Sequence, residues 1–315
     1  MLNVIVEQRT QEAEGILSLD FISATGAELP AFKPGAHIDV HLPGGLVRQY
    51  SLCHPCQGAS SVKYTIAVQR EPQSRGGSIA VHALQVGTPL QIGLPRNLFE
   101  LAPKAQKHLL FAGGIGITPI LCMAQALLDQ QQPFELHYFC RSPERAAFAQ
   151  LLGSPALQPF VKLHIGADAP ATVAQLLAQP SAQSHVYVCG PTGFMDCVLD
   201  TAASQGWDAQ NLHKEYFTPV SSEQDGDQSF QVQLASTGQL YDIPAGKAVF
   251  EILDSAGVDV PVSCEQGVCG TCVTRVLGGI PDHRDQYLTD AEKAANNCFT
   301  PCCSRARSPV LVLDL

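Results

Sequence analysis

The chain has 315 residues, of which 45% are hydrophobic, and its formal net charge at pH 7 is −10. A chain of this length can form two or three domains, each with its own hydrophobic core. The negative charge argues against a nucleic-acid partner, because such partners are bound through Lys and Arg, and it favours a basic protein surface instead.

Residues 1–102 consist of short runs in which apolar and polar positions alternate, and Pro and Gly separate these runs. The pattern predicts an all-β domain, either a barrel or a sandwich. The runs are Val4–Val6, Ile16–Phe21, His37–Leu42, Tyr64–Val68 and Pro89–Leu94.

Two segments of this region combine charged, polar and glycine residues. The segment 48–51 reads Arg-Gln-Tyr-Ser, and the segment 74–78 reads Ser-Arg-Gly-Gly-Ser. The second segment offers backbone N–H groups, hydroxyls and a guanidinium, which together suit a phosphate. When either segment is taken alone, a solvated turn with a surface arginine explains it better.

Residues 103–217 change to an alternation of strands and helices, which predicts a parallel sheet covered by helices. The expected strands are Leu109–Ala112, Glu135–Cys140, Val161–Ile165 and His185–Cys189. The nearly uncharged run 109–128 resembles a membrane span in length. Its glycines and a proline interrupt it, so we expect a buried strand, a tight turn and a helix there instead.

Two turns of this region follow buried strands and precede helices. The first contains Gly113, Gly114 and Gly116, and the second is Cys189-Gly190-Pro191. Backbone N–H groups at such turns can receive a pyrophosphate, and neighbouring turns at the carboxyl ends of parallel strands form a crevice. The first turn departs from the usual dinucleotide fingerprint, so it is weak evidence by itself.

Residues 218–229 are polar and lack an apolar period, which predicts a linker. Residues 230–315 then predict a mixed sheet over one helix. The expected elements are a hairpin of 230–234 with 239–243, a helix at 249–256, a strand at 273–277, a short helix near 290–295 and a last strand at 310–313.

Cys264, Cys269 and Cys272 have the C-x4-C-x2-C spacing of a plant-type 2Fe-2S cluster, whose fourth ligand is a more distant cysteine. Structural zinc fits less well, because it favours two separated cysteine pairs. A disulfide framework fits less well still in a chain of this size. Spacing alone leaves the fourth ligand open among Cys298, Cys302 and Cys303.

Six further segments occur in the order known from one family: R-x-Y-S at 48–51, S-R-G-G-S at 74–78, P-R-N-L-F at 95–99, G-G-I-G-I-T-P at 113–119, C-G-P at 189–191 and E-Y-F at 215–217. With the cysteines they make the whole chain resemble the phthalate dioxygenase reductase family. The resemblance implies an antiparallel FMN-binding β-barrel of the ferredoxin reductase type at 1–102 and an NADH-binding α/β domain at 103–217. A plant-type 2Fe-2S ferredoxin domain of the β-grasp fold would follow the linker at 230–315.

The resemblance also implies roles for single residues. The flavin ring and ribityl chain would be held by Arg48, Tyr50 and Ser51. The terminal FMN phosphate would be bound by Arg75, Gly76, Gly77 and Ser78. Thr118 would lie near the flavin N5 edge, and Phe217 would cover the isoalloxazine. The family's C-x-S-R-A pattern makes Cys302 the fourth cluster ligand, although the adjacent Cys303 departs from that pattern.

The nucleotide is expected to be NADH. An NADPH site needs a cation for the 2′-phosphate after the strand at the adenosine end, which we take to be 161–165. Residues 166–184 contain no Lys or Arg, and Asp168 would repel a phosphate while accepting hydrogen bonds from ribose hydroxyls.

The predicted function is transfer of electrons from NADH through FMN and the cluster to a separate oxygenase of the Rieske type. A flavin is needed because NADH gives two electrons together and the cluster accepts one. There are two alternatives: a self-contained flavin oxidoreductase for a small acceptor, and a redox-sensing iron-sulfur protein. We expect a cytoplasmic location, because no signal peptide is evident and the other cysteines lie in apolar runs. The organic substrate and the oligomeric state cannot be deduced from the sequence.

Overall fold

The computed structural model describes residues 1–315 except 57, 73, 75, 218–225, 263–264 and 266. The chain divides into two compact units, Met1–Phe217 and Thr218–Leu315. Arg75 and Cys264, which the sequence assigns to the phosphate and cluster sites, lie outside the described residues.

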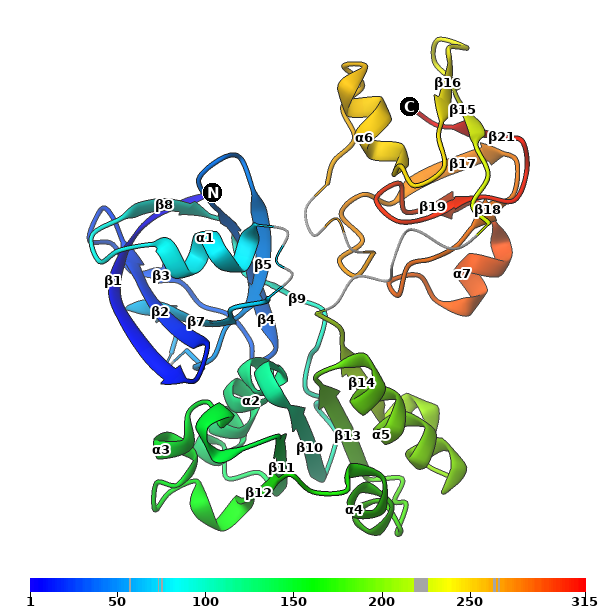
Figure 1. The fold of residues 1–315 in the computed structure, drawn as a ribbon. Coiled ribbons are helices and arrows are strands. Elements are labelled where there is room, and N and C mark those ends of the chain that lie inside the picture. Colours follow the sequence, from blue (N-terminus) through cyan, green and yellow to red (C-terminus); the bar gives the residue numbers. More distant parts are fainter. Residues whose placement is uncertain (57, 73, 75, 218–225, 263–264, 266) are drawn as a thin grey trace. The chain divides into compact units, whose positions relative to one another are not determined.

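The first unit begins with an antiparallel β-barrel (Figure 1), which decides between the barrel and the sandwich. Its strands follow the order β5-β4-β8-β1-β2-β7. A bridge between Leu52 and Ile66 and a 2.9 Å hydrogen bond from Cys53 N to Thr65 O join the two ends of this sheet. The strands are β1 (Leu2–Ala13), β2 (Ile16–Ser23), β4 (Ala36–His41), β5 (Val47–Ser51), β7 (Lys63–Gln69) and β8 (Pro89–Ile92), with β9 (Arg96–Asn97) paired to β4 and a small ladder of β3 (Leu29–Pro30) with β6 (Ser60–Ser61).

The barrel domain also contains a helix, α1 (Gly77–Ala83), which the alternating pattern did not predict. The helix has only seven residues, which is too few to show a clear helical period of apolar residues. Its first residues, Gly77 and Ser78, are also typical of turns. Val81 is its buried anchor in the barrel core. The glycine loop therefore connects a barrel strand to a helix.

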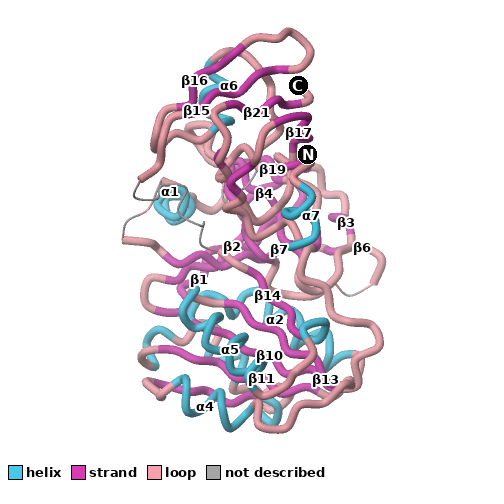
Figure 2. The backbone as a smooth tube through the Cα atoms, turned by 90° about the vertical axis from the view of Figure 1, so that its right-hand side faces the viewer, coloured by secondary structure: helices cyan, strands magenta, loops and turns pink. Residues whose placement is uncertain are grey.

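The second half of this unit is a parallel sheet with the order β12-β11-β10-β13-β14. Helices α2 and α3 cover one face and α4 and α5 the other (Figure 1), and Figure 2 shows the strands of this sheet with α2, α4 and α5 around them. The strands are β10 (Lys107–Gly113), β11 (Phe134–Cys140), β12 (Val161–Ile165), β13 (Ser184–Cys189) and β14 (Leu212–Glu215). The helices are α2 (Ile117–Asp129), α3 (Ala149–Leu152), α4 (Ala169–Leu176) and α5 (Thr192–Ser204), with 3-10 turns η1 (Gly114–Gly116), η2 (Pro143–Arg145), η3 (Gln158–Phe160) and η4 (Ala209–Asn211).

The barrel and the parallel sheet share one buried core. Cys53 and Phe99 from the barrel side belong to the same apolar cluster as Ile120 and Leu121 of α2. The run 109–128 forms β10, η1 and α2, as expected. None of the helices among the described residues is long and apolar enough to span a bilayer.

The second unit contains a mixed sheet with the order β16-β15-β21-β17-β19, and α6 packs against it through Val249 and Leu253. Strands β15 and β21 run parallel, whereas the other pairs are antiparallel. The elements are β15 (Phe230–Leu234), β16 (Leu240–Ile243), α6 (Val249–Ser255), β17 (Thr274–Gly278), β18 (Pro281–Asp282), α7 (Asp290–Ala295), β19 (Cys298–Phe299), β20 (Arg305–Ala306) and β21 (Val310–Leu313).

The end of the segment expected to be a linker contacts the second unit. Asp227 accepts hydrogen bonds from both terminal nitrogens of Arg284, at 2.9 and 2.5 Å. The carbonyl of Gln228 accepts one from Arg305 at 3.0 Å. Asp227 and Gln228 therefore belong structurally to the second unit, and 218–225 lie outside the described residues.

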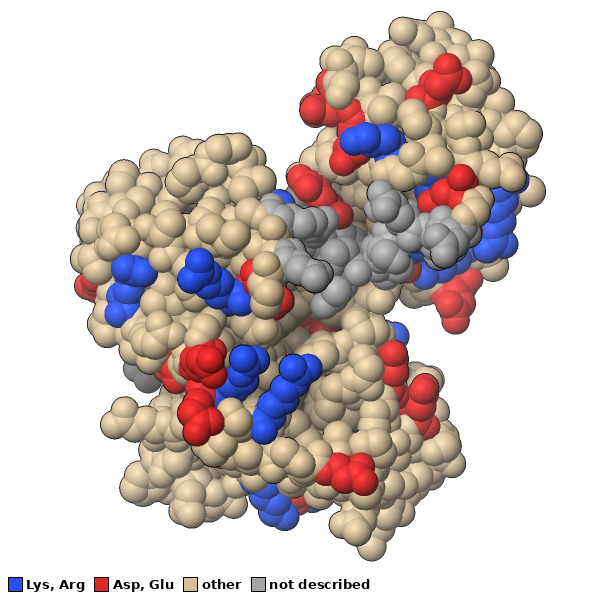
Figure 3. All heavy atoms as spheres, viewed as in Figure 1, with Lys and Arg blue, Asp and Glu red and all other residues tan. Residues whose placement is uncertain are grey.

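Charges on the first unit are balanced locally. On the face drawn in Figure 3, its Lys and Arg side chains stand among Asp and Glu. Ion pairs such as Lys107–Glu135 at 2.6 Å and Arg145–Glu14 at 3.7 Å illustrate this arrangement. Exposed pairs of this kind contribute little to stability.

Candidate flavin, nicotinamide and iron-sulfur sites

The two glycine turns of the parallel sheet touch each other. A Cβ atom on Gly116 would lie 2.2 Å from the carbonyl oxygen of Cys189, and one on Gly190 would lie 2.9 Å from Cα of Gly113. Any larger residue would push the turns apart. Since β10 and β13 are neighbours, the two turns that follow them lie side by side at the carboxyl ends of these strands, where the sequence predicts a dinucleotide site.

Thr118 lies in the first turn of α2, directly after the first of these glycine turns. Its side chain is 2% exposed, and its hydroxyl donates a hydrogen bond to the carbonyl of Ile115 at 3.2 Å. Pro191 closes the other side, because a Cβ on Gly113 would lie 3.0 Å from its ring. The structure thus brings Thr118, the glycines and the C-G-P turn together.

A hydrogen bond connects the barrel to the end of the parallel sheet. The hydroxyl of Ser51 donates to Oε2 of Glu215 at 3.0 Å, although the two residues are 164 positions apart. Burial raises the pKa of the Glu215 carboxyl to about 8, and the hydrogen bond from Ser51 acts in the opposite direction. Desolvation therefore favours the protonated carboxyl more strongly here than in an exposed glutamate.

Cys189 lies beside this carboxyl. It is the register partner of Glu215 in the parallel pair β13–β14, and it is fully buried. Burial, and then the nearby Glu215, raise the pKa of its thiol well above the usual value. Ser51, Cys189 and Glu215 thus bring a hydroxyl, a thiol and a carboxyl together at the carboxyl ends of β13 and β14.

Glu215 is a site residue whose role the sequence did not reveal. It appeared only as part of the E-Y-F segment. The available signal was an acidic residue at the carboxyl end of a strand next to the C-G-P turn, but its burial and its bond to Ser51 depend on the folded chain.

The barrel side of the site contains Arg48 and Tyr50 on β5. Burial raises the pKa of Tyr50 to about 12, and the nearby Arg48 acts in the opposite direction. A Cβ on Gly77 would lie 2.7 Å from Cγ of Arg48, so the arginine stem lies across the glycine loop. Arg48 and the 74–78 loop therefore meet, as one phosphate site requires.

The loop itself gathers hydroxyl and backbone groups. The hydroxyl of Ser74 accepts a hydrogen bond from Gly76 N at 3.1 Å and contacts the hydroxyl of Ser78 at 3.0 Å. Gly76 has φ = 92°, a conformation that favours glycine. These groups, with the neighbouring Arg48, suit a phosphate group.

Asp168 and Phe217 stand at two edges of the first unit's site. Asp168 follows the edge strand β12, is exposed, and caps α4 by accepting a hydrogen bond from Ala171 N at 3.5 Å. Phe217 is half-buried and packs against the core shared by the barrel and the sheet. Their contacts with a nucleotide or a flavin remain predictions.

The cysteine site in the second unit brings together two sulfurs. The Sγ atoms of Cys272 and Cys302 lie 3.3 Å apart, and both residues are buried. Cys269 Sγ accepts a hydrogen bond from Thr271 N at 3.5 Å, a contact of the type that stabilises thiolate ligands. With Cys264 outside the described residues, no group of three or more metal-binding side chains is found among the rest.

The neighbouring cysteines lie differently. Cys303 Sγ would be 2.4 Å from a Cβ on Gly267 and lies 3.3 Å from Thr300 Oγ1, so its thiol sits beneath the cysteine loop. Cys298 is half-exposed on β19. The contact with Cys272 favours Cys302 as the fourth ligand. A donor set of thiolates in a glycine-containing loop fits a 2Fe-2S cluster.

Two family models match parts of this chain. A family model for the 2Fe-2S iron-sulfur cluster binding domain matches residues 232–307. A model for the N-terminal domain of dimethylamine monooxygenase subunit DmmA-like proteins matches residues 94–212.

Relatives match over the full length. A protein named vanillate O-demethylase oxidoreductase, from Pseudomonas sp. (strain HR199 / DSM 7063), is 54% identical over 319 residues, which cover 100% of both chains. Phthalate dioxygenase reductase from Burkholderia cepacia is 37% identical over 100% of this chain and 97% of its own. The chain belongs to the phthalate dioxygenase reductase family.

A solved structure of a phthalate dioxygenase reductase superposes on this reductase with a TM-score of 0.79 and 37% identity, over 100% of this chain and 98% of the other. Its title describes electron transfer from pyridine nucleotides to [2Fe-2S]. This reductase is accordingly an NADH-dependent oxidoreductase with a flavin domain and a 2Fe-2S domain, and it serves an oxygenase. The predicted family, fold and reaction class are confirmed.

Proposed function

We propose that this reductase carries FMN and supplies electrons to a Rieske-type oxygenase that demethylates an aromatic methyl ether such as vanillate. The observation that carries the substrate is the 54% identity, over the full length of both chains, to a protein named vanillate O-demethylase oxidoreductase. Aromatic catabolism in the cytoplasm is the corresponding setting. The vanillate itself would bind the oxygenase and not this chain.

FMN is supported by the hydroxyl and backbone groups of Ser74, Gly76 and Ser78, and by the resemblance to phthalate dioxygenase reductase. Arg48 and the backbone of Gly76 and Gly77 would bind the terminal phosphate, together with Arg75 and Ser78. Tyr50 and Ser51 would hold the ring and ribityl chain. When bound, the flavin would accept the hydride of NADH and pass on single electrons to the 2Fe-2S centre.

The residues of the crevice would orient the nicotinamide. The backbone of Gly113, Gly114, Gly116 and the C-G-P turn would receive the pyrophosphate, and Thr118 would border the reacting edge of the flavin. Phe217 would cover the ring until the nicotinamide arrives. Desolvation raises the pKa of the Glu215 carboxyl to about 8, and in its protonated form Glu215 would add no negative charge beside the nicotinamide.

NADH is the proposed donor because Asp168, at the start of α4, would accept hydrogen bonds from ribose hydroxyls and repel a 2′-phosphate. In the second unit, Cys264, Cys269, Cys272 and Cys302 would ligate the cluster. Their loop would be the exit for electrons toward the oxygenase.

The test is removal of the second unit. A chain ending at residue 221 keeps the whole first unit, which ends at Phe217. We expect it to retain FMN and to reduce an artificial dye with NADH, while its support of oxygenase turnover falls to background. The full-length protein is the control in both assays. A truncated chain that drives the oxygenase at the full rate would contradict the proposed order of carriers and would favour a self-contained flavin reductase.

A further inference from the structure

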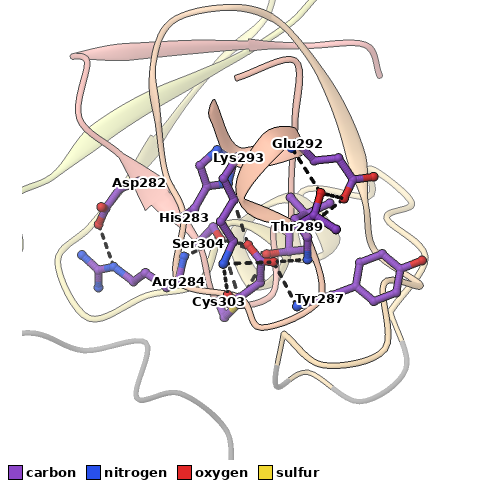
Figure 4. A network of polar contacts seen from close by, with 12 residues as sticks. Asp282, His283, Arg284, Tyr287, Thr289, Glu292, Lys293, Cys303 and Ser304 are labelled. Carbon is purple, nitrogen blue, oxygen red and sulfur yellow. Dashed lines mark hydrogen bonds and ion pairs between the residues drawn. The ribbon is translucent and has the colours of Figure 1, made fainter. Parts of the chain in front are cut away.

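A buried acidic side chain lies behind the cysteine loop, which we define as residues 264–272. The side chain of Asp285 has no exposed surface. Its Oδ2 accepts hydrogen bonds from the backbone N–H groups of Tyr287 at 3.1 Å and Leu288 at 2.7 Å. Figure 4 shows this network around the turn that precedes α7. These bonds fix the position of the carboxylate.

Asp285 directly contacts the cysteine loop. A Cβ on Gly267 would lie 3.1 Å from Cα and 3.3 Å from Cβ of Asp285. The next residue, Gln286, donates its backbone N–H to the carbonyl of Gly267 at 2.9 Å. The buried carboxylate therefore lies next to Gly267, within the loop that carries cluster ligands.

The same carboxylate also reaches the segment that carries Cys302. Ser304 Oγ donates to Asp285 Oδ1 at 3.5 Å, and Thr300 Oγ1 lies 2.8 Å from Ser304 Oγ. Thr300 and Ser304 are fully buried. Asp285 thus bridges the two segments that supply sulfur ligands, through groups shielded from water.

A single cation of α7 partly compensates this charge. Lys293 Nζ donates to the carbonyl of Asp285 at 2.6 Å and lies 3.9 Å from its Oδ2. The lysine side chain is 27% exposed. His283 Nδ1 is 3.8 Å from Oδ1. The carboxylate is buried more deeply than the ammonium, so water screens the positive charge more than the negative one.

We propose that Asp285 and Lys293 set the reduction potential of the 2Fe-2S cluster through their opposite charges. Reduction adds one electron to the cluster and breaks no bond, so it adds one negative charge beside Asp285. The carboxylate disfavours the reduced state and lowers the potential, whereas Lys293 favours the reduced state. Nearby charge and hydrogen bonding are known determinants of such potentials.

Asp285 and Lys293 thus adjust the reduction potential of the cluster without ligating it. The inference rests on the cluster assigned above. A lowered potential makes the reduced cluster a stronger donor to the oxygenase. A lowered potential also decreases the fraction of the cluster that the reduced flavin can reduce. The opposite charges of Asp285 and Lys293 therefore set the potential between the value that favours reduction by the flavin and the value that favours electron transfer to the oxygenase.

The experiment is a redox titration of full-length protein, followed by the EPR signal of the reduced cluster, which is distinct from the flavin. Asp285→Asn keeps the shape and an acceptor oxygen for the N–H groups but removes the charge. We expect at least a tenfold rise in the ratio of reduced to oxidised cluster at fixed solution potential, about 59 mV for one electron. Lys293→Met keeps the apolar stem, and we expect the ratio to fall about threefold, because the lysine is partly screened.

Matched controls carry the same charge changes at exposed positions of the second unit. Asp290→Asn lies on α7, and Lys247→Met removes a lysine whose side chain is 58% exposed. Both should leave the ratio within about twofold of the wild type, because exposed charges are screened. Shifts of opposite sign in the two test variants are the signature of charge.

Iron content is measured first, so that loss of the cluster is not mistaken for a shift of potential. If Asp285→Asn fails to load iron, Lys293→Met alone decides. The inference is overturned if Lys293→Met shifts the ratio no more than the controls do, or if both test variants shift it in the same direction, as a rearranged loop would. Absence of iron from the wild type would instead overturn the cluster assignment.

Discussion

The two units treat shielded acidic side chains in opposite ways. In the first unit, the half-buried Glu215 accepts a hydrogen bond from the neutral hydroxyl of Ser51, and desolvation raises the pKa of its carboxyl to about 8. In the second unit, Asp227 is bound by Arg284, and Asp285 lies beside Lys293. The raised pKa favours a neutral carboxyl at Glu215, whereas cations compensate the other two carboxylates.

This difference matters because the first unit serves hydride transfer and the second unit serves single-electron transfer. A neutral carboxyl adds no fixed charge to a site for hydride transfer from a dinucleotide. A cluster that exchanges single electrons responds to charges that stay in place. The cost of an isolated buried charge is avoided in both, by protonation in one and by pairing in the other.

The largest expected effect concerns the cluster itself. Cys302→Ser should abolish or greatly weaken the cluster, whereas Cys303→Ser should retain it, because the Cys302 sulfur contacts Cys272 and the Cys303 sulfur lies beneath Gly267. Iron content and visible absorbance measure the outcome. Both variants should keep NADH-dependent dye reduction, which shows that the first unit is independent. Retention of iron in Cys302→Ser with loss in Cys303→Ser would move the ligand to Cys303.

The next effect tests pairing in the second unit. Asp227→Ala should destabilise that unit by about 3 kcal/mol, because it removes the carboxylate that accepts hydrogen bonds from both terminal nitrogens of the buried Arg284. Denaturant unfolding followed at the cluster absorbance measures this change. Asp242→Ala, at an exposed position of β16, is the matched control and should change stability by less than about 0.5 kcal/mol. Equal effects of the two substitutions would show that Asp227 belongs to a loose linker.

Protonation in the first unit can be tested with Glu215→Gln, which keeps an acceptor for Ser51. The pKa of Glu215 rises from 4.5 to about 8 on burial, so folding favours the protonated form. This contribution is complete below pH 4.5 and is lost as the pH rises through about 8. Relative to the Gln variant, the wild type should lose up to about 1.4 kcal/mol of stability per pH unit in that window.

The single tryptophan, Trp207, is buried in the first unit, so its fluorescence reports unfolding of that unit alone. Glu7→Gln, at an exposed position of β1, is the control and should follow the wild type at every pH. If the wild type and Glu215→Gln also respond to pH alike, Glu215 is ionised in the folded protein and the contrast between the units disappears.

The smallest expected effect concerns nucleotide choice. Asp168→Arg should narrow the preference for NADH over NADPH about tenfold, or about 1.4 kcal/mol, because a cation replaces an anion near the expected 2′-phosphate. The ratio of kcat/KM for the two nucleotides is the measurement. Asp129→Arg makes the same charge change at the exposed end of α2 and should leave the ratio unaltered. A wild type that uses both nucleotides equally would refute this placement of the adenosine site.

Much of the fold could be predicted because its signals are local. The helix expected at 249–256 is α6 (Val249–Ser255), and the expected hairpin is β15 with β16. Helix α1 was missed because seven residues after a glycine loop carry little periodicity. The predicted linker, 218–229, includes Asp227, because a polar residue in a polar segment is expected to be exposed to solvent. In the folded chain Asp227 forms an ion pair with Arg284.

The sequence by itself determined the order of domains, the crevice turns and the cysteine spacing, because each depends on residues close together in the chain. Only the tertiary structure decided that Ser51 binds Glu215, that Cys302 rather than Cys303 meets Cys272, and that Asp285 lies behind the cysteine loop. The physical reason is that the charge of a buried carboxyl and the direction of a thiol are set by burial and by partners brought from distant segments.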